Sequence, residues 1–164
     1  MNGEGERLPL DPDRGAGSPT TGASRPVHLR WNSLALVFIG GSLGTAAREA
    51  ISLAFPPIDG VPYAIFGINV AGALLLGFLI EALVRHGRGT PGALRLRLLL
   101  GTGLLGGFTT YSALASDAAS LIGAGSTGPG IAYATATVLV GALATWTGIA
   151  LAAGGRARST RRHA

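Results

Sequence analysis

Four long apolar stretches, separated by short polar links, constrain the fold of this chain more than any other feature. Each is close to the roughly 20 residues that an α-helix needs to cross the hydrocarbon core of a bilayer. The helices of a soluble bundle would carry a wide polar face, which residues 70–80 and 138–153 lack. The pattern predicts an all-α, polytopic membrane protein whose four transmembrane helices lie at about residues 33–55, 61–84, 98–122 and 131–153.

Composition agrees with a membrane protein and excludes several classes of site. Only 13% of the residues are charged, whereas a soluble domain carries roughly a quarter. The absence of cysteine excludes disulfides, thiolate catalysis and cysteine-bound metals. The His residues lie outside the apolar stretches, and no phosphate-binding loop or catalytic Ser/His/Asp set is present. We therefore expect neither an enzyme nor a His-bound metal.

All 13 basic residues are Arg, and their distribution along the chain is one-sided. The links after the first and third stretches contain none, while the leading segment, the middle link and the tail carry all of them except Arg48. Four crossings place those three segments on one side of the bacterial cell membrane, which the positive-inside rule identifies as the cytoplasm. The net charge of +5 thus indicates the lipid bilayer, and not nucleic acid, as the partner.

The same pattern divides the chain into three regions. Residues 1–32 combine Gly, Pro and mixed charges and cannot bury enough apolar surface to fold, so we expect a disordered cytoplasmic tail. Residues 33–153 are predicted to form the transmembrane domain. Residues 154–164 are predicted to form a basic tail, also in the cytoplasm.

Polar residues inside the spans are informative, since each costs free energy in hydrocarbon unless it is paired or lines a wet cavity. Gly40, Gly44 and Arg48 recur at every fourth position and therefore share one helical face. The glycines allow a close approach of another helix, and we interpret Arg48 as a structural anchor in preference to a pathway residue. Asn69 suits two roles equally well, an interhelical hydrogen bond or an N–H donor to a permeating anion.

The third span carries the strongest signal. Its residues 101–112 read Gly-Thr-Gly-Leu-Leu-Gly-Gly-Phe-Thr-Thr-Tyr-Ser, which is poor helix-forming sequence near the middle of a crossing. We interpret it as an interruption of the helix, which is tolerated where backbone is buried in protein or lines a cavity. An interruption frees carbonyls that can ligate a cation and amides that can face an anion. The alternative is a continuous Gly-rich helix whose hydroxyls bond back to i−4 carbonyls.

In the fourth span, Tyr133, Thr137, Gly141 and Thr145 follow at four-residue intervals and form a narrow polar stripe. Hydroxyls one turn apart can pass a hydrogen-bonding ion along, although ordinary helix packing explains this stripe better when it is taken alone. No acid stands alone at the middle of a span, as a proton-coupled carrier would require.

Three of these segments together resemble the CrcB/Fluc family of fluoride channels. They are Gly-Gly-Ser-Leu-Gly at 40–44 with Arg48, Asn-Val-Ala-Gly at 69–72, and Gly-Leu-Leu-Gly-Gly-Phe-Thr-Thr-Tyr-Ser at 103–112. Their order, their spacing and the four-span layout all agree with the family over about residues 33–153.

The resemblance implies a fluoride-specific channel that exports fluoride passively from the cytoplasm and so lowers its toxicity. It implies two subunits inserted antiparallel, with two narrow pores between them. It also implies a structural Na⁺ ion, bound by the backbone carbonyls of Gly106 and Thr109. The pore-lining positions that it implies are Asn69, Tyr111, Ser112, Tyr133 and Thr137.

The chain departs from the family at Gly141, where a Ser often stands, and more clearly at residues 111–114. The family's Phe-Ser-Thr-Phe reads Tyr-Ser-Ala-Leu at 111–114 here, so the second aromatic ring is replaced by Leu114. An antiparallel homodimer needs a chain that inserts both ways, whereas the one-sided Arg distribution predicts one orientation. We therefore expect a heterodimer with a homologous, oppositely inserted subunit. The alternatives are a small four-span proton-coupled exporter and a non-conducting partner subunit of a fluoride channel.

Overall fold

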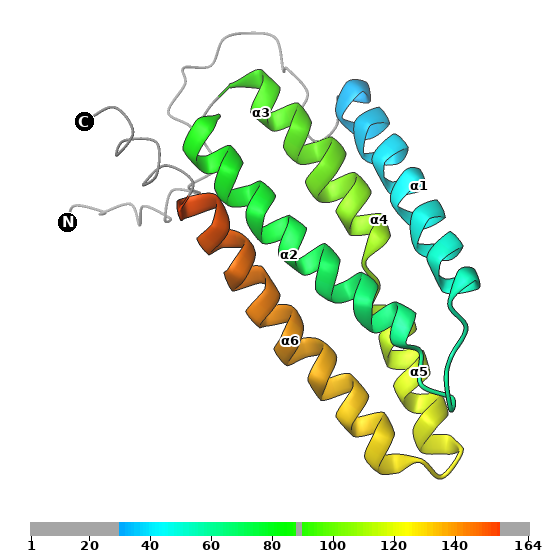
Figure 1. The fold of residues 1–164 in the computed structure, drawn as a ribbon. Helices are drawn as coiled ribbons and strands as arrows, with labels where there is room; N and C mark the ends of the chain where they lie inside the picture. Colours follow the sequence, from blue (N-terminus) through cyan, green and yellow to red (C-terminus); the bar gives the residue numbers. More distant parts are fainter. Residues whose placement is uncertain (1–29, 88–89, 155–164) are drawn as a thin grey trace, which may run out of the picture.

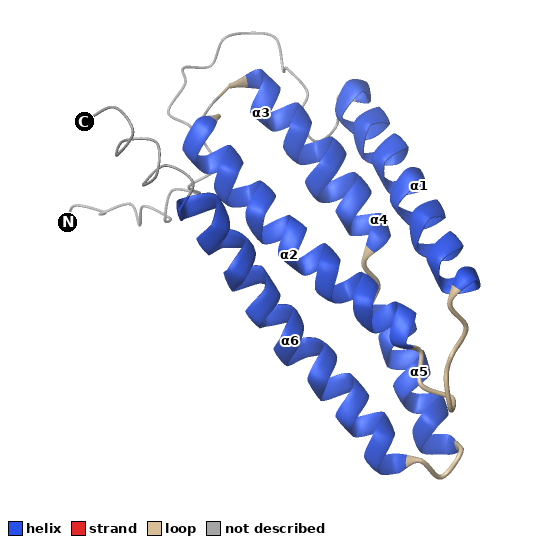
Figure 2. Cartoon of the chain, viewed as in Figure 1, coloured by secondary structure: helices blue, strands red, loops and turns tan. Residues whose placement is uncertain are grey.

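The computed structural model describes residues 30–87 and 90–154, which form a bundle of helices (Figure 1). Figure 2 shows these residues as helices joined by short loops, with no strand drawn among them. The elements in chain order are α1 (Trp31–Ala54), α2 (Tyr63–His86), α3 (Pro91–Leu96), the π-helical segment η2 (Arg97–Leu105), α4 (Gly106–Phe108), α5 (Tyr111–Gly123) and α6 (Thr127–Gly154).

Four helical segments are long and apolar enough to cross a membrane, as the sequence predicts. α1, α2 and α6 each form one, and α3, η2, α4 and α5 together form the third, Pro91–Gly123. We refer to Pro91–Gly123 as the third span. Of the predicted tails, residues 30–32 and Gly154 are described, whereas 1–29 and 155–164 lie outside the described residues.

The third span begins at Pro91, earlier than the predicted position 98. Thr90 caps this start, since its side-chain oxygen accepts a hydrogen bond from the amide of Ala93 at 3.2 Å. Pro91 stands at the first helical position, where a missing N–H costs nothing. This local capping extends the helix through the Arg residues that interrupt the apolar pattern.

Glycines set the distance between the long helices. On α2 and α6, Gly77 faces the backbone of Thr145, and Gly148 faces the backbone of Leu74, so no side chain separates the two helices there. α1 lies in the same way against η2 and α4 of the third span. The bundle therefore consists of α2 packed on α6 and α1 packed on the first half of the third span, with α5 against α6 (Figure 1).

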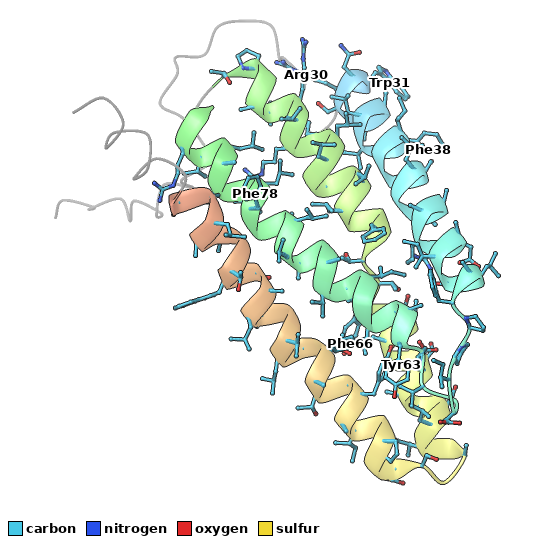
Figure 3. All side chains as sticks on the ribbon, in the orientation of Figure 1. Arg30, Trp31, Phe38, Tyr63, Phe66 and Phe78 are labelled. Atoms are coloured by element: carbon cyan, nitrogen blue, oxygen red, sulfur yellow. The ribbon has the colours of Figure 1, made fainter. Side chains whose placement is uncertain are left out.

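Among residues 30–87 and 90–154, few side chains are buried in the single chain, and many large apolar ones face outward. The buried cluster is small and joins α5 to α6 through Leu114, Ala118, Leu121 and Tyr133. Trp31 and Phe38 project from α1 away from the bundle (Figure 3), and Trp146 of α6 is 80% exposed. Such an apolar exterior is suited to contact with lipid or another subunit.

Candidate functional site

The third span is interrupted near its middle, as predicted. α4 ends at Phe108 and α5 begins at Tyr111. Between them the backbone is extended, with φ −79° and ψ 155° at Thr109 and φ −149° and ψ 120° at Thr110. The interruption is visible as a short loop between α4 and α5 (Figure 2).

Two threonine hydroxyls define the ends of this interruption. The Thr109 hydroxyl donates to the carbonyl of Leu105 at 2.9 Å, which is a bond back to the preceding turn. The Thr110 side chain accepts from the amide of Ala113 at 3.1 Å and so caps the start of α5. One threonine closes the helix before the interruption, and the next restarts it.

Asn69 of α2 fixes the backbone of the interruption. Its Oδ1 accepts from the amide of Thr110 at 2.8 Å, and its Nδ2 donates to the carbonyl of the same residue at 3.0 Å. Of the two roles that the sequence left open, the interhelical hydrogen bond is therefore present. A primary amide has a second N–H, which these bonds leave for another acceptor.

These side-chain bonds divert two amides from their helical acceptors. In a continuous α-helix the amide of Thr110 would bond the carbonyl of Gly106, and that of Ala113 the carbonyl of Thr109. Here those amides bond Asn69 and the Thr110 hydroxyl instead. The Gly106 and Thr109 carbonyls therefore lose their usual amide partners. Carbonyl oxygens freed at a helix break are ligands of the kind that bind Na⁺ in membrane proteins, so the two residues fit such an ion.

Glycines of α1 and α2 bring neighbouring helices onto the interrupted span. A Cβ atom added to Gly40 would lie 2.8 Å from the amide nitrogen of Leu104, and one on Gly44 would lie 2.8 Å from that of Phe108. Gly72 of α2 similarly faces the side chain of Thr109. Residues with larger side chains at these positions would displace the helices from the interrupted segment.

Arg48 lies one turn beyond Gly44 on α1. Its Nη1 is 3.6 Å from Oε2 of Glu49, and its side chain is 22% exposed. The Nε atom is buried and has no hydrogen-bond partner among the described residues, and the same holds for the hydroxyl of Ser52 one turn further on. The structure thus places an Arg–Glu pair and two unpaired polar groups near the end of α1.

Tyr111 and Ser112 lie on the outer surface of the single chain, directly after the interruption. Tyr111 is 80% exposed, and the hydroxyl oxygens of Ser112 and Thr110 are 3.2 Å apart. Tyr111 also lines a shallow groove with Thr135 and Val138 of α6. An exposed phenol on a membrane-spanning segment costs free energy in contact with lipid tails unless it meets a polar neighbour.

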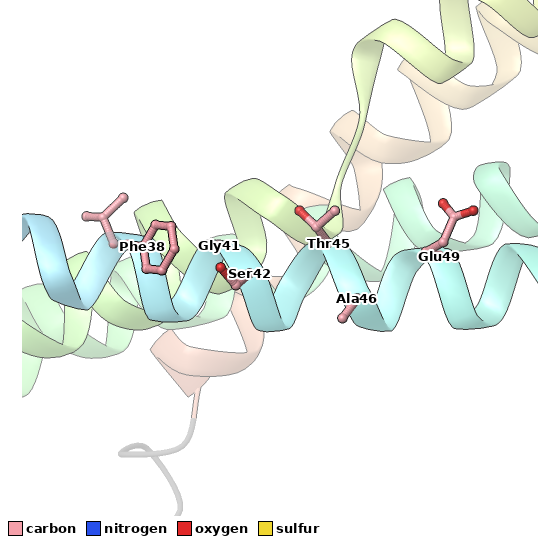
Figure 4. Close-up of a pocket in the computed structure, with 7 residues that line it drawn as sticks. Phe38, Gly41, Ser42, Thr45, Ala46 and Glu49 are labelled. Carbon is pink, nitrogen blue, oxygen red and sulfur yellow. The ribbon is translucent and has the colours of Figure 1, made fainter.

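Polar groups also line the outer face of α1. Gly41, Ser42, Thr45 and Glu49 border a groove of about 650 Å³ on this helix (Figure 4). The Thr45 hydroxyl lies 3.4 Å from the carbonyl oxygen of Gly107, to which it donates. Val37, Phe38 and Ala46 line the same groove, so this face is mainly apolar with a few polar groups set into it.

Tyr133 and Thr137 form a separate, buried pair in α6, with exposed fractions of 6% and 4%. The Thr137 hydroxyl donates to the carbonyl of Tyr133 at 2.7 Å. The Tyr133 hydroxyl faces the carboxylate of Asp117, yet neither it nor Oδ2 of Asp117 has a hydrogen-bond partner among the described residues. Sequence reasoning did not place Asp117 in the site. The sequence feature that could have identified it is its position, because Asp117 is an acidic residue inside a predicted span, beyond the interrupted segment.

The predicted pore-lining residues thus fall into two groups in the single chain. Asn69 and Ser112 meet at the interruption around Thr110. Tyr133 and Thr137 lie in the core between α5 and α6, where Leu114 also packs. Leu114 therefore occupies the core, and the exposed ring beside the interruption is that of Tyr111.

Comparison with known families matches residues 35–149 to the family described as CrcB-like protein, Camphor Resistance (CrcB). The chain belongs to this family. One similar protein is the Fluoride-specific ion channel FluC 2 of Leifsonia xyli subsp. xyli, 50% identical over 131 residues that cover 80% of this chain and 90% of the relative. Another is the Fluoride-specific ion channel FluC 1 of Cutibacterium acnes, which is 47% identical over 116 residues. These residues cover 70% of this chain and 81% of the relative. A third, the Fluoride-specific ion channel FluC 1 of Streptomyces coelicolor, is 37% identical over 129 residues, which cover 76% of this chain and 82% of the relative.

Membership of the CrcB family confirms the resemblance drawn from the three sequence motifs. With four membrane-length helices, this CrcB-family chain is a multi-pass membrane protein. The names of its relatives are those of ion channels, which agrees with the expectation that the chain is not an enzyme.

Proposed function

We propose that this chain is a subunit of a fluoride-specific channel in the bacterial cell membrane, which lets fluoride leave the cytoplasm passively and lowers its toxicity. The observation that carries the proposal is the interrupted third span, held by Asn69, in a chain 50% identical to a protein named as a fluoride-specific ion channel. Both termini are proposed to lie in the cytoplasm, on the basis of the one-sided Arg distribution.

The donors around the interruption suit the chemistry of fluoride. A pore must replace the tightly held water of this small anion with hydrogen-bond donors of comparable strength. The second N–H of Asn69, the Ser112 hydroxyl and the hydroxyl or positive ring edge of Tyr111 are such donors. Tyr133 and Thr137 would extend the pathway through α6 once the ion has passed Asn69 and Ser112.

A second subunit is proposed to complete the pore. Tyr111 is 80% exposed beside the middle of the third span, and Ser42 and Thr45 line an open groove on α1. The Thr45 hydroxyl already donates to the Gly107 carbonyl. Lipid tails offer no hydrogen-bond partner to the Tyr111 phenol or the Ser42 hydroxyl, whereas the matching surface of an antiparallel subunit can provide one. Because the Arg distribution favours one orientation of this chain, the partner is proposed to be a homologous chain inserted the other way. Relatives with the numbered names FluC 1 and FluC 2 are consistent with genomes that encode two such chains.

The carbonyls of Gly106 and Thr109 are proposed to bind a structural Na⁺ ion. Their usual amide partners bond Asn69 and the Thr110 hydroxyl, which leaves both oxygens available for a cation. A bound Na⁺ supplies positive charge that offsets the carbonyl dipoles at the interruption. Asn69 and Thr110 keep the two oxygens out of the helical hydrogen-bond pattern.

Leu114 favours a second candidate function, that of a non-conducting subunit which orients and stabilises a conducting sister. Leu114 has no aromatic edge to offer an anion, and it is 6% exposed within the α5–α6 core. In a heterodimer, one of the two pores would then lack a ring contributed by this chain.

Fluoride efflux from liposomes tests both candidates. The chain is reconstituted alone and together with the proposed homologous partner chain, and efflux is followed with a fluoride electrode. We expect rapid efflux only from the pair, with no dependence on a proton gradient. Efflux driven by a proton gradient would support the exporter and contradict the channel.

Substitutions in this chain distinguish a subunit that lines a conducting pore from a non-conducting subunit that only stabilises its partner. In the pair, Ser112→Ala is expected to lower efflux roughly tenfold or more, since a hydrogen bond to a charged group contributes about 1.5–3 kcal/mol. Ser120→Ala, at an exposed position further along α5, serves as the matched control. An efflux rate unchanged by Ser112→Ala would favour the supporting role.

A further inference from the structure

A groove of about 660 Å³ lies at the Arg-bearing end of the bundle, away from the interruption. It is bordered by the residue preceding α1, the last turns of α2 and the start of the third span. Its wall is mainly aliphatic, and it is formed by Ile80, Leu83, Val84, Ala93 and Leu94. An apolar groove of this size can hold part of a hydrocarbon chain.

Two arginines also line the groove, and none of its lining residues in the described part of the chain is acidic. Arg30 precedes α1, and Arg97 begins η2, so the two positive charges come from segments far apart in the sequence. The ion pairs within the described part of the chain are Arg48 with Glu49 and Arg85 with Glu81, so neither groove arginine is neutralised there. Guanidinium groups bind phosphate oxygens through two parallel hydrogen bonds.

The groove lies at the depth where the helices end. Trp31, next to Arg30, projects outward at the start of α1 (Figure 3), and Trp is enriched at the membrane–water interface. α2 ends at His86, and the distance along the helix from Ile80 to this end is about 9 Å at 1.5 Å per residue. The groove thus begins at the level of the headgroups and extends toward the hydrocarbon core.

We propose that this groove binds an anionic phospholipid, with the phosphate held by Arg30 and Arg97 and one acyl chain along the aliphatic wall. A free phosphate would leave that wall uncovered, and a zwitterionic lipid would bring its own cation close to the two arginines. Basic pockets between transmembrane helices bind anionic headgroups in this way. The proposal concerns a site separate from the interruption and does not depend on which ion the protein conducts.

Native mass spectrometry of the full-length protein tests the charge requirement. The purified protein is titrated with phosphatidylglycerol or with phosphatidylcholine of the same chain length, and the bound lipid is counted. We expect preferential retention of phosphatidylglycerol, and a loss of roughly tenfold or more in the R30Q/R97Q variant, since each basic residue near an anionic surface contributes about fivefold. Arg95→Gln, an exposed arginine that does not line the groove, is expected to change nothing.

A second pair of variants tests the acyl-chain wall without altering charge. Val84→Trp fills the groove and is expected to lower phosphatidylglycerol retention, whereas Leu151→Trp, at an exposed position near the end of α6, is not.

Equal retention of the two lipids, or retention unaffected by R30Q/R97Q, would overturn the proposal. Competition by inorganic phosphate that persists in Val84→Trp would indicate a simple anion site. Dissociation of a subunit pair by Val84→Trp would assign the groove to a second chain. Either result would also overturn the proposal.

Discussion

The side chain of Asn69 and the backbone of Thr110 exchange two hydrogen bonds, one in each direction, between α2 and the interrupted third span. Because Asn69 accepts the hydrogen bond from the amide of Thr110, that amide does not form the helical hydrogen bond to the carbonyl of Gly106. A side chain on one helix thus maintains the non-helical backbone of another.

Removal of this pair is expected to destabilise the protein. In Asn69→Ala the partly buried amide of Thr110 loses its acceptor, and we expect the free energy of unfolding to fall by about 1–3 kcal/mol. Reversible unfolding in mixed detergent micelles measures the change. Asn32→Ala, at the exposed start of α1, is the control and is expected to have little effect. Equal stability of the two variants would mean that Thr110 does not depend on Asn69.

The capping role of Thr110 leads to a second prediction. Thr110→Val keeps the shape of the side chain but removes the acceptor for the amide of Ala113, and we expect a loss of about 1 kcal/mol in stability. Thr110→Ser retains the hydroxyl and is expected to stay near the parent value. If the two variants unfold at the same denaturant concentration, the cap contributes nothing measurable.

The glycines of α1 lead to a third prediction, which concerns close packing between helices. Gly44→Ala places a methyl group against the backbone of Leu104 and Phe108, and overpacking of this kind costs about 1–3 kcal/mol. Gly67→Ala on α2 is the matched control, since nothing lies within 4 Å of its added Cβ. There the gain in helix propensity is expected to stabilise the protein by about 0.5–1 kcal/mol. Thermal unfolding of both variants should therefore shift in opposite directions, and a stabilised Gly44→Ala would contradict the close packing.

Several features of this structure follow from sequence patterns that act locally. Uncharged runs of membrane length predict the spans, and the Gly-Gly-Phe-Thr-Thr sequence at 106–110 predicts the interruption. The early start of the third span was missed because Arg95 and Arg97 break the apolar run, although Thr90 and Pro91 are an ordinary helix start.

Other features depend on how the helices pack, which sequence spacing does not determine. The interhelical hydrogen bonds of Asn69 could be assigned only from the packing, because its amide meets Thr110, 41 positions away. Likewise, the burial of Tyr133 against Asp117 reflects the rotation of α5 against α6. Spacing along α6 places Tyr133 and Thr137 on one face but does not say what that face contacts.

The orientation of the chain in the membrane gives the last prediction. Arg85, Arg95 and Arg97 lie at one end of the bundle, and the loop containing Asp59 lies at the opposite end of α2 without any arginine. The positive-inside rule then predicts that reporters fused to either terminus are cytoplasmic in nearly all molecules.

Moving positive charge to the other side, by Asp59→Arg combined with Arg95→Gln and Arg97→Gln, is expected to give a mixed population of the two membrane orientations. Dual reporters, one active on each side of the membrane, measure the ratio, and Arg95→Lys with Arg97→Lys serves as the charge-preserving control. If the parent chain already gives substantial signal on both sides, it can pair with its own copies, and the requirement for a separate, oppositely inserted partner disappears.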